Sequence, residues 1–252
     1  VYLFDEATKH LFVKDSEQPY IEEKPYAWIR ANQVGGRSLM WARQTYRWSE
    51  MDFEANLRDG HGIDWPIRYS DIAPWYDYVE SFVGVSGQAE GLPQLPDGKF
   101  LEPMEMTAVE KHAKRSIKAS FPDRVMTIGR CAVLTEEVNG RAPCHYCGEC
   151  ERGCSTRSFF SAVSVSLPAA AGTGNMTLQA NSIVHSIIYD AEKDRARGVR
   201  VIDSITRQMT EYYAKVIFMC ASTLGTTQIM LNSKDSRFPD GIANSSGVLG
   251  HY

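Results

Sequence analysis

The sequence predicts a mixed α/β protein that contains both helices and strands. Two observations support this class. Apolar residues recur at helical spacing around 72–83 and 107–117, whereas beyond residue 174 they alternate or form the short runs typical of strands. Of the 252 residues, 43% are hydrophobic and 11% aromatic, which is enough to build a sizeable core. We therefore expect one large or two modest globular domains.

The first segment of interest, 28–48, is rich in arginine and aromatic residues. At its centre Gly35 and Gly36 allow the backbone to approach a ligand or another segment closely. This pattern predicts a structured loop that leads into a helix or an irregular stretch.

Two helices are expected in the middle of the chain. Asp71 can cap a helix over 72–83, which Gly84 would terminate. Thr107 and Glu110 have the spacing of a capping box that begins a second helix. One face of this second helix is apolar and consists of Val109, Ala113 and Ile117.

Strands are predicted in the last third of the chain. Leu178, 183–189 and 198–202 have strand character, and 203–208 resembles a hairpin turn that continues into 210–214.

A buried strand and a helix are expected next. The continuous apolar run 216–221 suits a strand that is buried on both faces, and Ser222 or Thr223 would cap a helix reaching about Leu231. Such a strand-to-helix turn presents free backbone N–H groups to a ligand such as a pyrophosphate.

Charge and hydropathy exclude two classes of function. The net charge of −4 provides no basic face for phosphates, so nucleic-acid binding is not expected. The longest apolar run, 216–221, is far shorter than the roughly 18–20 residues of a transmembrane helix, so no membrane-spanning segment is expected. The beginning at Val1 and the abrupt end at Tyr252 lead us to expect truncation at both ends, and the cellular compartment is not predicted.

Four cysteines lie within eleven residues, in the pattern Cys144-x-x-Cys147-x-x-Cys150-x-x-x-Cys154. This spacing resembles that of ferredoxins, so we expect all four sulfurs to converge on one centre. An iron–sulfur cluster is the first interpretation, and a staple of disulfides or free thiols is the second. Zinc is the third, because zinc sites usually separate their two cysteine pairs by many more residues. Two further cysteines stand apart: Cys131, and Cys220, which is predicted to be a small buried hydrophobic residue.

Three motifs together resemble the interior of a glucose-methanol-choline (GMC) family FAD-dependent oxidoreductase. They are RANQVGGRSLMW at 30–41, DWPIRYSDIAPWY at 64–76 and CASTLGTTQIMLNS at 220–233. The resemblance covers essentially the whole chain and is strongest to bacterial sugar dehydrogenases and pyranose oxidases.

The resemblance implies part of an FAD-binding Rossmann-like domain into which a substrate-side segment is inserted. Residues 1–58 would be an FAD-associated segment, 59–174 the substrate side with the cysteine-rich loop, and 175–252 the return of the FAD-binding domain. The family's N-terminal ADP-binding βαβ unit and its C-terminal catalytic histidine would lie outside these residues, so no catalytic residue is assigned.

The same resemblance implies that FAD is held without a covalent bond, because Met40 stands where some relatives carry a flavin-linked histidine. Trp41 and Val184 are equally compatible with ordinary core positions. The implied cofactor-binding residues are Arg30, Val34, Gly35, Gly36, Arg37, Ser38, Met40, Trp41, Ala42, Val184, Cys220 and Ala221.

The implied function is oxidation of the CH–OH group of an alcohol or sugar, with hydride transfer to flavin N5. Some family dehydrogenases pass electrons through a cysteine-bound iron–sulfur cluster, which would make a cytochrome or another electron acceptor a partner. The alternative is an iron–sulfur or zinc-binding electron-transfer module without a flavin of its own.

Overall fold

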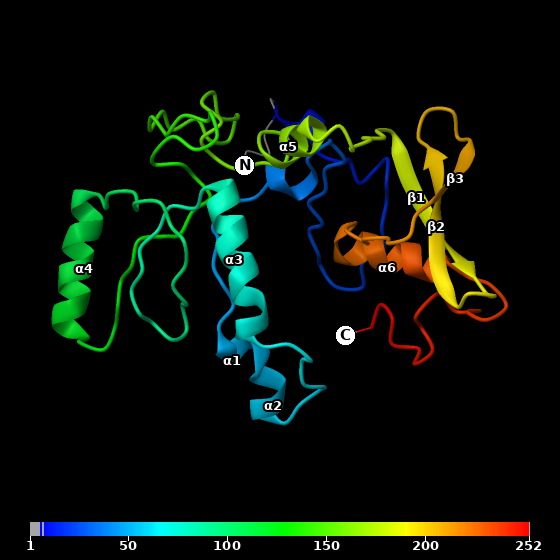
Figure 1. Ribbon diagram of the computed structural model, residues 1–252, viewed down its shortest axis with the longest axis horizontal. Coiled ribbons are helices and arrows are strands. Elements are labelled where there is room, and N and C mark those ends of the chain that lie inside the picture. Colours follow the sequence, from blue (N-terminus) through cyan, green and yellow to red (C-terminus); the bar gives the residue numbers. More distant parts are fainter. Residues whose placement is uncertain (1–5, 7, 252) are drawn as a thin grey trace. The chain divides into compact units, whose positions relative to one another are not determined.

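The computed structural model describes residue 6 and residues 8–251, and its helices and strands are labelled in Figure 1. The chain forms two compact units, Val1–Met176 (unit 1) and Thr177–Tyr252 (unit 2). The described residues before 59 belong to the same compact unit as the middle segment. The assignment of these segments to FAD-associated and substrate-side domains stays a prediction.

Unit 2 is built on a three-stranded antiparallel sheet in the order β1–β2–β3. The strands are β1 (Ser182–Asp190), β2 (Arg195–Asp203) and β3 (Met209–Tyr213). These strands and the turn over 203–208 confirm the predicted hairpins, although Leu178 lies before the first strand.

Helix α6 (Ser222–Asn232) follows the sheet in sequence. The Ser233 hydroxyl, directly after this helix, accepts a hydrogen bond from the Ile187 N–H of β1 at 2.8 Å. The predicted helix is confirmed, but the predicted cap at Ser222 or Thr223 is not. Ala221 is the N-cap residue, and no side chain caps this end.

The prediction of a buried strand over 216–221 is wrong. This run is irregular, and Phe218 is 83% exposed. Cys220 is also exposed, contrary to the prediction. A strand buried on both faces needs a hydrogen-bonded neighbour and a covering layer, whereas the described sheet of this unit ends at β3. Apolar composition alone does not provide the hydrogen-bonded neighbour that a strand needs.

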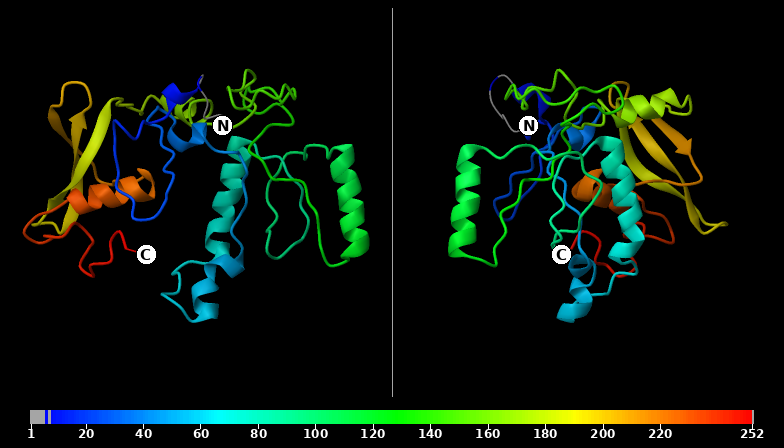
Figure 2. Two further views of the ribbon diagram at one scale, coloured as in Figure 1. Left: turned by 180° about the vertical axis from the view of Figure 1, so that it is seen from behind. Right: turned by 60° about the vertical axis from the view of Figure 1, so that its left-hand side comes forward.

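Unit 1 contains helices joined by long irregular segments (Figure 2). Its helical elements are η1 (Lys9–Leu11), η2 (Gly36–Leu39), α1 (Glu50–Phe53), α2 (Ala55–Asp59), α3 (Tyr69–Val83), α4 (Ala108–Ser120) and α5 (Ser166–Gly172). Only isolated bridges, such as Gln44↔Cys131 and Ser86↔Leu101, link its described extended segments. The expectation that 28–48 is a structured loop is confirmed, since η2 is its one regular turn.

Helix α3 begins three residues earlier than the sequence predicts. Arg68 is its N-cap, and Asp71 is the third helical residue, whose carboxylate accepts the Arg68 N–H at 2.8 Å. An acidic residue at this third position completes a capping box from inside the helix, so Asp71 does cap the helix but not as its first residue. Gly84 ends the helix with φ +77°, as predicted.

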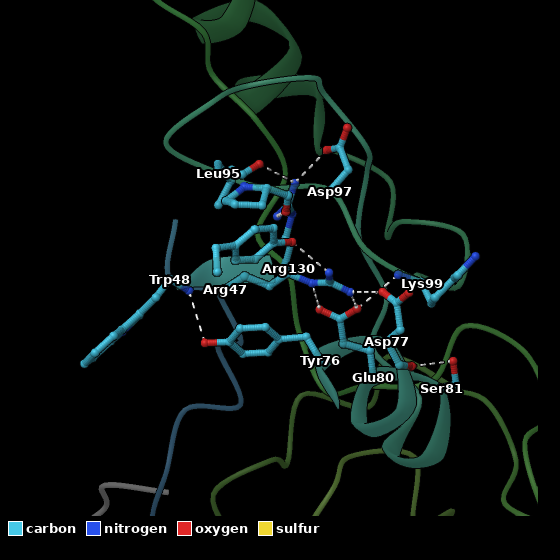
Figure 3. A network of polar contacts seen from close by, with 12 residues as sticks. Arg47, Trp48, Tyr76, Asp77, Glu80, Ser81, Leu95, Asp97, Lys99 and Arg130 are labelled. Atoms are coloured by element: carbon cyan, nitrogen blue, oxygen red, sulfur yellow. Dashed lines mark hydrogen bonds and ion pairs between the residues drawn. The ribbon is translucent and has the colours of Figure 1, made fainter. Parts of the chain in front are cut away.

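The core of unit 1 is small, and buried arginines extend it. Val83, Val85 and Ala132 are buried together, with four aromatic side chains packed against them. Beside this cluster Arg47 donates from Nε to Glu80 Oε1 at 2.8 Å, and Arg130 donates to the Pro96 carbonyl at 2.5 Å (Figure 3). Burial lowers the pKa of Arg47, but hydrogen bonds to its acidic partners raise it by more, so the guanidinium stays charged.

Candidate functional site

Both glycines of the glycine-centred loop have left-handed backbone. Gly35 has φ +105° and Gly36 φ +53°, in the left-handed region that favours glycine. A Cβ atom on Gly35 would lie 3.0 Å from Val163 Cγ1, whereas one on Gly36 would meet nothing within 4 Å. Gly35 is therefore needed for packing inside the protein, and Gly36 presents bare backbone to open space.

Ser38 anchors this loop to a distant segment. Its hydroxyl donates to the Gly35 carbonyl at 2.6 Å and accepts from the Ala162 N–H at 2.8 Å. One side chain therefore fixes the loop and ties it to the chain 124 residues later.

The two arginines of the motif brace the loop from its flanks. Arg37 donates to the Ile29 carbonyl at 2.7 Å. Arg30 donates to Asp15 at 2.6 Å, and its guanidinium carbon lies 4.3 Å from the centre of the Trp28 ring. The Arg30 Nε atom is buried and has no hydrogen-bond partner in the described structure, so this face of the guanidinium retains an unused donor.

The three residues after the loop differ in their surroundings. Met40 is buried. Trp41 donates from its indole nitrogen to the Phe160 carbonyl at 3.1 Å and packs edge-to-face on that ring, with ring centres 5.9 Å apart. Ala42 is exposed and lines a cavity.

This cavity of about 350 Å³ also receives the cysteine-rich loop. All four cysteines of the motif line it, together with Cys131, which the spacing pattern had set apart. Each of these thiols is free. Among the described residues, no group of three His, Cys, Asp or Glu side chains is arranged to hold a metal ion. The thiols therefore share a cavity without ligating geometry in this structure, and their role as metal ligands stays a prediction.

The residues of the cavity wall that sequence reasoning missed include Arg43, Gln44 and Cys131. Arg43 has φ +65°, and its guanidinium carbon lies 5.1 Å from the centre of the Phe159 ring. Gln44 donates to Cys131 Sγ at 3.1 Å. Burial raises the pKa of the Cys131 thiol, against smaller opposing effects of Arg43 and Gln44. No spacing signal could have found this set, because a single bridge between distant segments creates it.

The remaining predicted cofactor residues lie in unit 2. Val184 is half-buried on β1 opposite Val201, next to an irregularity of the register. Cys220 and Ala221 are exposed immediately before α6. The role of these three residues in binding a flavin stays a prediction.

Comparison with known proteins places the chain among the oxidoreductases. A family model described as GMC oxidoreductase matches residues 8–236. The chain therefore belongs to the GMC oxidoreductase family, whose members generally bind FAD, and this confirms the resemblance that the motifs indicate.

Several curated relatives are dehydrogenases and oxidases. The chain is 29% identical over 232 residues to the 2-methyl-1,2-propanediol dehydrogenase of Mycolicibacterium austroafricanum, covering 88% of this chain and 40% of that protein. It is 26% identical to the paromamine 6'-oxidase of Streptomyces fradiae, covering 98% of this chain and 44% of that protein. It is 25% identical to the fructose dehydrogenase large subunit of Gluconobacter japonicus, with coverages of 86% and 40%. The chain thus spans about two fifths of the length of these relatives.

Proposed function

We propose that the whole protein is an FAD-dependent oxidoreductase that acts on the CH–OH group of an alcohol or sugar. The family match over residues 8–236 carries this proposal, because it includes both the Gly35 loop and the turn before α6. The dehydrogenase and oxidase relatives support the same class of reaction. FAD, when bound, supplies the acceptor of the hydride that leaves the donor carbon.

The described residues fit a flavin nucleotide at the loop. Gly36 offers backbone without a side chain, and the buried Arg30 Nε has an unused hydrogen to donate. Ser38 holds the loop in one conformation, so the loop needs little reordering to meet a ligand. In this role Gly36 and Arg30 bind the flavin nucleotide, whereas Gly35, Ser38 and Arg37 hold the loop in position.

We expect FAD to be bound without a covalent bond, because the thioether of Met40 offers no nucleophilic nitrogen. Acid or heat is expected to release the flavin from the denatured full-length protein into the supernatant. Flavin that stays with the precipitated polypeptide would show a covalent bond and contradict this part of the proposal.

A matched pair of glycine variants tests the loop in the full-length protein. Gly36→Ala and Gly60→Ala both place a Cβ on a residue with positive φ and with no atom within 4 Å, but Gly60 only ends α2. Both variants bear a similar strain of roughly 1–2 kcal/mol. Gly36→Ala is expected to weaken FAD binding by about tenfold or more, whereas Gly60→Ala leaves it unchanged. Equal effects would assign the loop a purely structural role.

The reaction itself is tested by mixing the oxygen-free, full-length protein with alcohols and sugars and following the flavin absorbance. Bleaching of the flavin by a CH–OH donor is the expected result. A protein that binds no flavin, yet transfers electrons through its cysteines, would instead be the electron-transfer module of the alternative hypothesis.

A second candidate function, electron relay through an iron–sulfur cluster, is favoured by one observation. All four motif cysteines line the same cavity as Ala42, a residue that we predict to lie near the flavin. Cysteine thiolates at this spacing are typical cluster ligands. Anaerobically purified full-length protein is then expected to contain iron and acid-labile sulfide. Zinc alone, or no metal together with full alcohol-oxidising activity, would leave these cysteines as a structural staple.

A further inference from the structure

Residues 159–163, which we call the supporting segment, lie alongside residues 35–43 and run in the opposite direction. Four contacts join the two stretches. In chain order, the residues Gly35, Ser38, Trp41 and Arg43 contact Val163, Ala162, Phe160 and Phe159 respectively. None of these four contacts is a hydrogen bond between two backbones. Side chains and close packing therefore hold the glycine-centred loop on the supporting segment.

The supporting segment is itself fixed by buried groups. Ala132 is fully buried, and its carbonyl accepts the Phe160 N–H at 2.8 Å while its own N–H donates to the Arg43 carbonyl at 2.9 Å. One buried residue thus holds the backbones of both stretches. On the other side of Phe160, the buried Ser161 hydroxyl lies 2.9 Å from the Ser164 hydroxyl. Phe160 is therefore anchored from both sides.

Phe160 in turn holds Trp41 in two directions. Its carbonyl accepts the indole N–H at 3.1 Å, and the two rings are 5.9 Å apart with an angle of 89° between their planes. The hydrogen bond fixes the nitrogen edge of the indole, and the perpendicular ring fixes its tilt. Both aromatic side chains pack against the buried cluster of Val83, Val85 and Ala132.

We propose that Phe160 is a positioning residue for the bound flavin and that it acts through Trp41. The inference rests on the function proposed above, in which the stretch from the loop to Trp41 and Ala42 holds FAD. Phe160 has no need to touch the flavin itself. It keeps Trp41 in one orientation before FAD binds, so less conformational freedom is lost on binding. No spacing pattern pointed to Phe160, because it lies 119 residues after Trp41.

A matched pair of phenylalanine variants tests this role in the full-length protein. Phe160 and Phe100 are both half-buried and pack against the same core cluster, but Phe160 contacts Trp41 whereas Phe100 lies against Arg130. Phe160→Leu is expected to raise the dissociation constant of FAD about two- to tenfold, which corresponds to the loss of one aromatic pair, and to change the visible circular dichroism of the bound flavin.

The control variants separate positioning from stability. Phe100→Leu is expected to lower the urea midpoint about as much as Phe160→Leu does, while both flavin measurements stay as in the wild type. Phe160→Tyr retains the ring and is expected to bind FAD nearly as the wild type does. Equal changes of FAD affinity in Phe100→Leu and Phe160→Leu would overturn the positioning role.

A double variant tests the route through Trp41. Once Trp41→Leu has removed the indole, adding Phe160→Leu is expected to weaken FAD binding no further, because residues that act through one contact are not additive. Losses that multiply in the double variant would contradict this route. A full-length wild-type protein that binds no flavin would overturn the proposed function and this inference with it, whereas the other outcomes concern Phe160 alone.

Discussion

The two units of the protein satisfy their backbone polar groups in different ways. In unit 2, β1, β2 and β3 pair along their lengths, so neighbouring strands provide the partners. In unit 1, the described extended segments pair only at isolated bridges, and guanidinium groups supply further hydrogen bonds to carbonyl groups. Arg130 donates to three carbonyls, those of Gln88, Leu95 and Pro96, and Arg141 donates to the carbonyl of Val83 at 2.7 Å.

This difference shows how irregular backbone can be buried. A buried carbonyl without a partner costs about 1–3 kcal/mol, so a loop-rich region needs donors from elsewhere. Arginine suits this purpose because one side chain offers five hydrogens in a fixed plane. The consequence is that stability in unit 1 depends on a few side chains, whereas in unit 2 it is spread over many backbone bonds.

The largest expected effect comes from removing a buried arginine of unit 1. Arg47→Met leaves the Glu80 carboxylate buried without its partner, which is expected to cost about 3–5 kcal/mol. The matched change in unit 2, Arg237→Met, removes an exposed ion pair with Asp194 and is expected to cost less than about 1 kcal/mol. Urea unfolding of the two full-length variants measures both. Similar losses of unfolding free energy in the two variants would contradict the proposed difference between the units.

A pair of serines sharpens the comparison, because each makes the same two bonds. Ser38 accepts from Ala162 N–H and donates to the Gly35 carbonyl, while Ser233 accepts from Ile187 N–H and donates to the Ile229 carbonyl. Ser38→Ala and Ser233→Ala are each expected to cost about 1–3 kcal/mol.

Only the change in unit 1 is expected to weaken FAD retention as well, because Ser38 holds the predicted flavin loop. Flavin content after gel filtration, together with the urea midpoint, distinguishes the two variants. Loss of flavin from Ser233→Ala alone would contradict the assignment of the flavin loop to Ser38.

A smaller effect is expected at the cap of α4. Thr107→Ala removes the hydroxyl that accepts the Glu110 N–H at 3.3 Å, and it is expected to destabilise this helix by about 1 kcal/mol. Thr107→Ser retains the oxygen and serves as the control. Amide hydrogen exchange over 108–120 reports the change locally, and exchange that is equally fast in both variants would contradict the capping role.

The smallest effect concerns pH and the hairpin turn of unit 2. Hydrogen bonds from the Thr206 and Ile205 N–H groups lower the pKa of Asp203 below its ordinary value of 3.8. The stabilisation is therefore complete above that ordinary value and is lost as the pH falls through the lower pKa of the folded state. Asp203→Asn is expected to reduce the loss of unfolding free energy in acid below about pH 4. An unchanged acid dependence would show that the turn does not depend on the ionised carboxylate.

Local signals in the sequence determined much of the secondary structure. Three such signals are the Thr107–Glu110 spacing, the glycine at position 84 and the hairpin pattern over 183–214. Each acts within a few residues, so the chain forms these elements wherever they lie in the fold. The glycine pair of the loop could be predicted for a similar reason, because glycine tolerates left-handed backbone that other residues rarely adopt.

Tertiary structure alone decided which apolar residues are covered and which distant side chains meet. The run 216–221 has the composition of a buried strand but has no partner in the described sheet, and the apolar face of α4 is present but contains no buried residue. Cys131 joins the cysteine-lined cavity only because its backbone bridges Gln44, 87 residues earlier. Burial and long-range pairing depend on what the rest of the chain places alongside a segment, and no window of neighbouring residues contains that information.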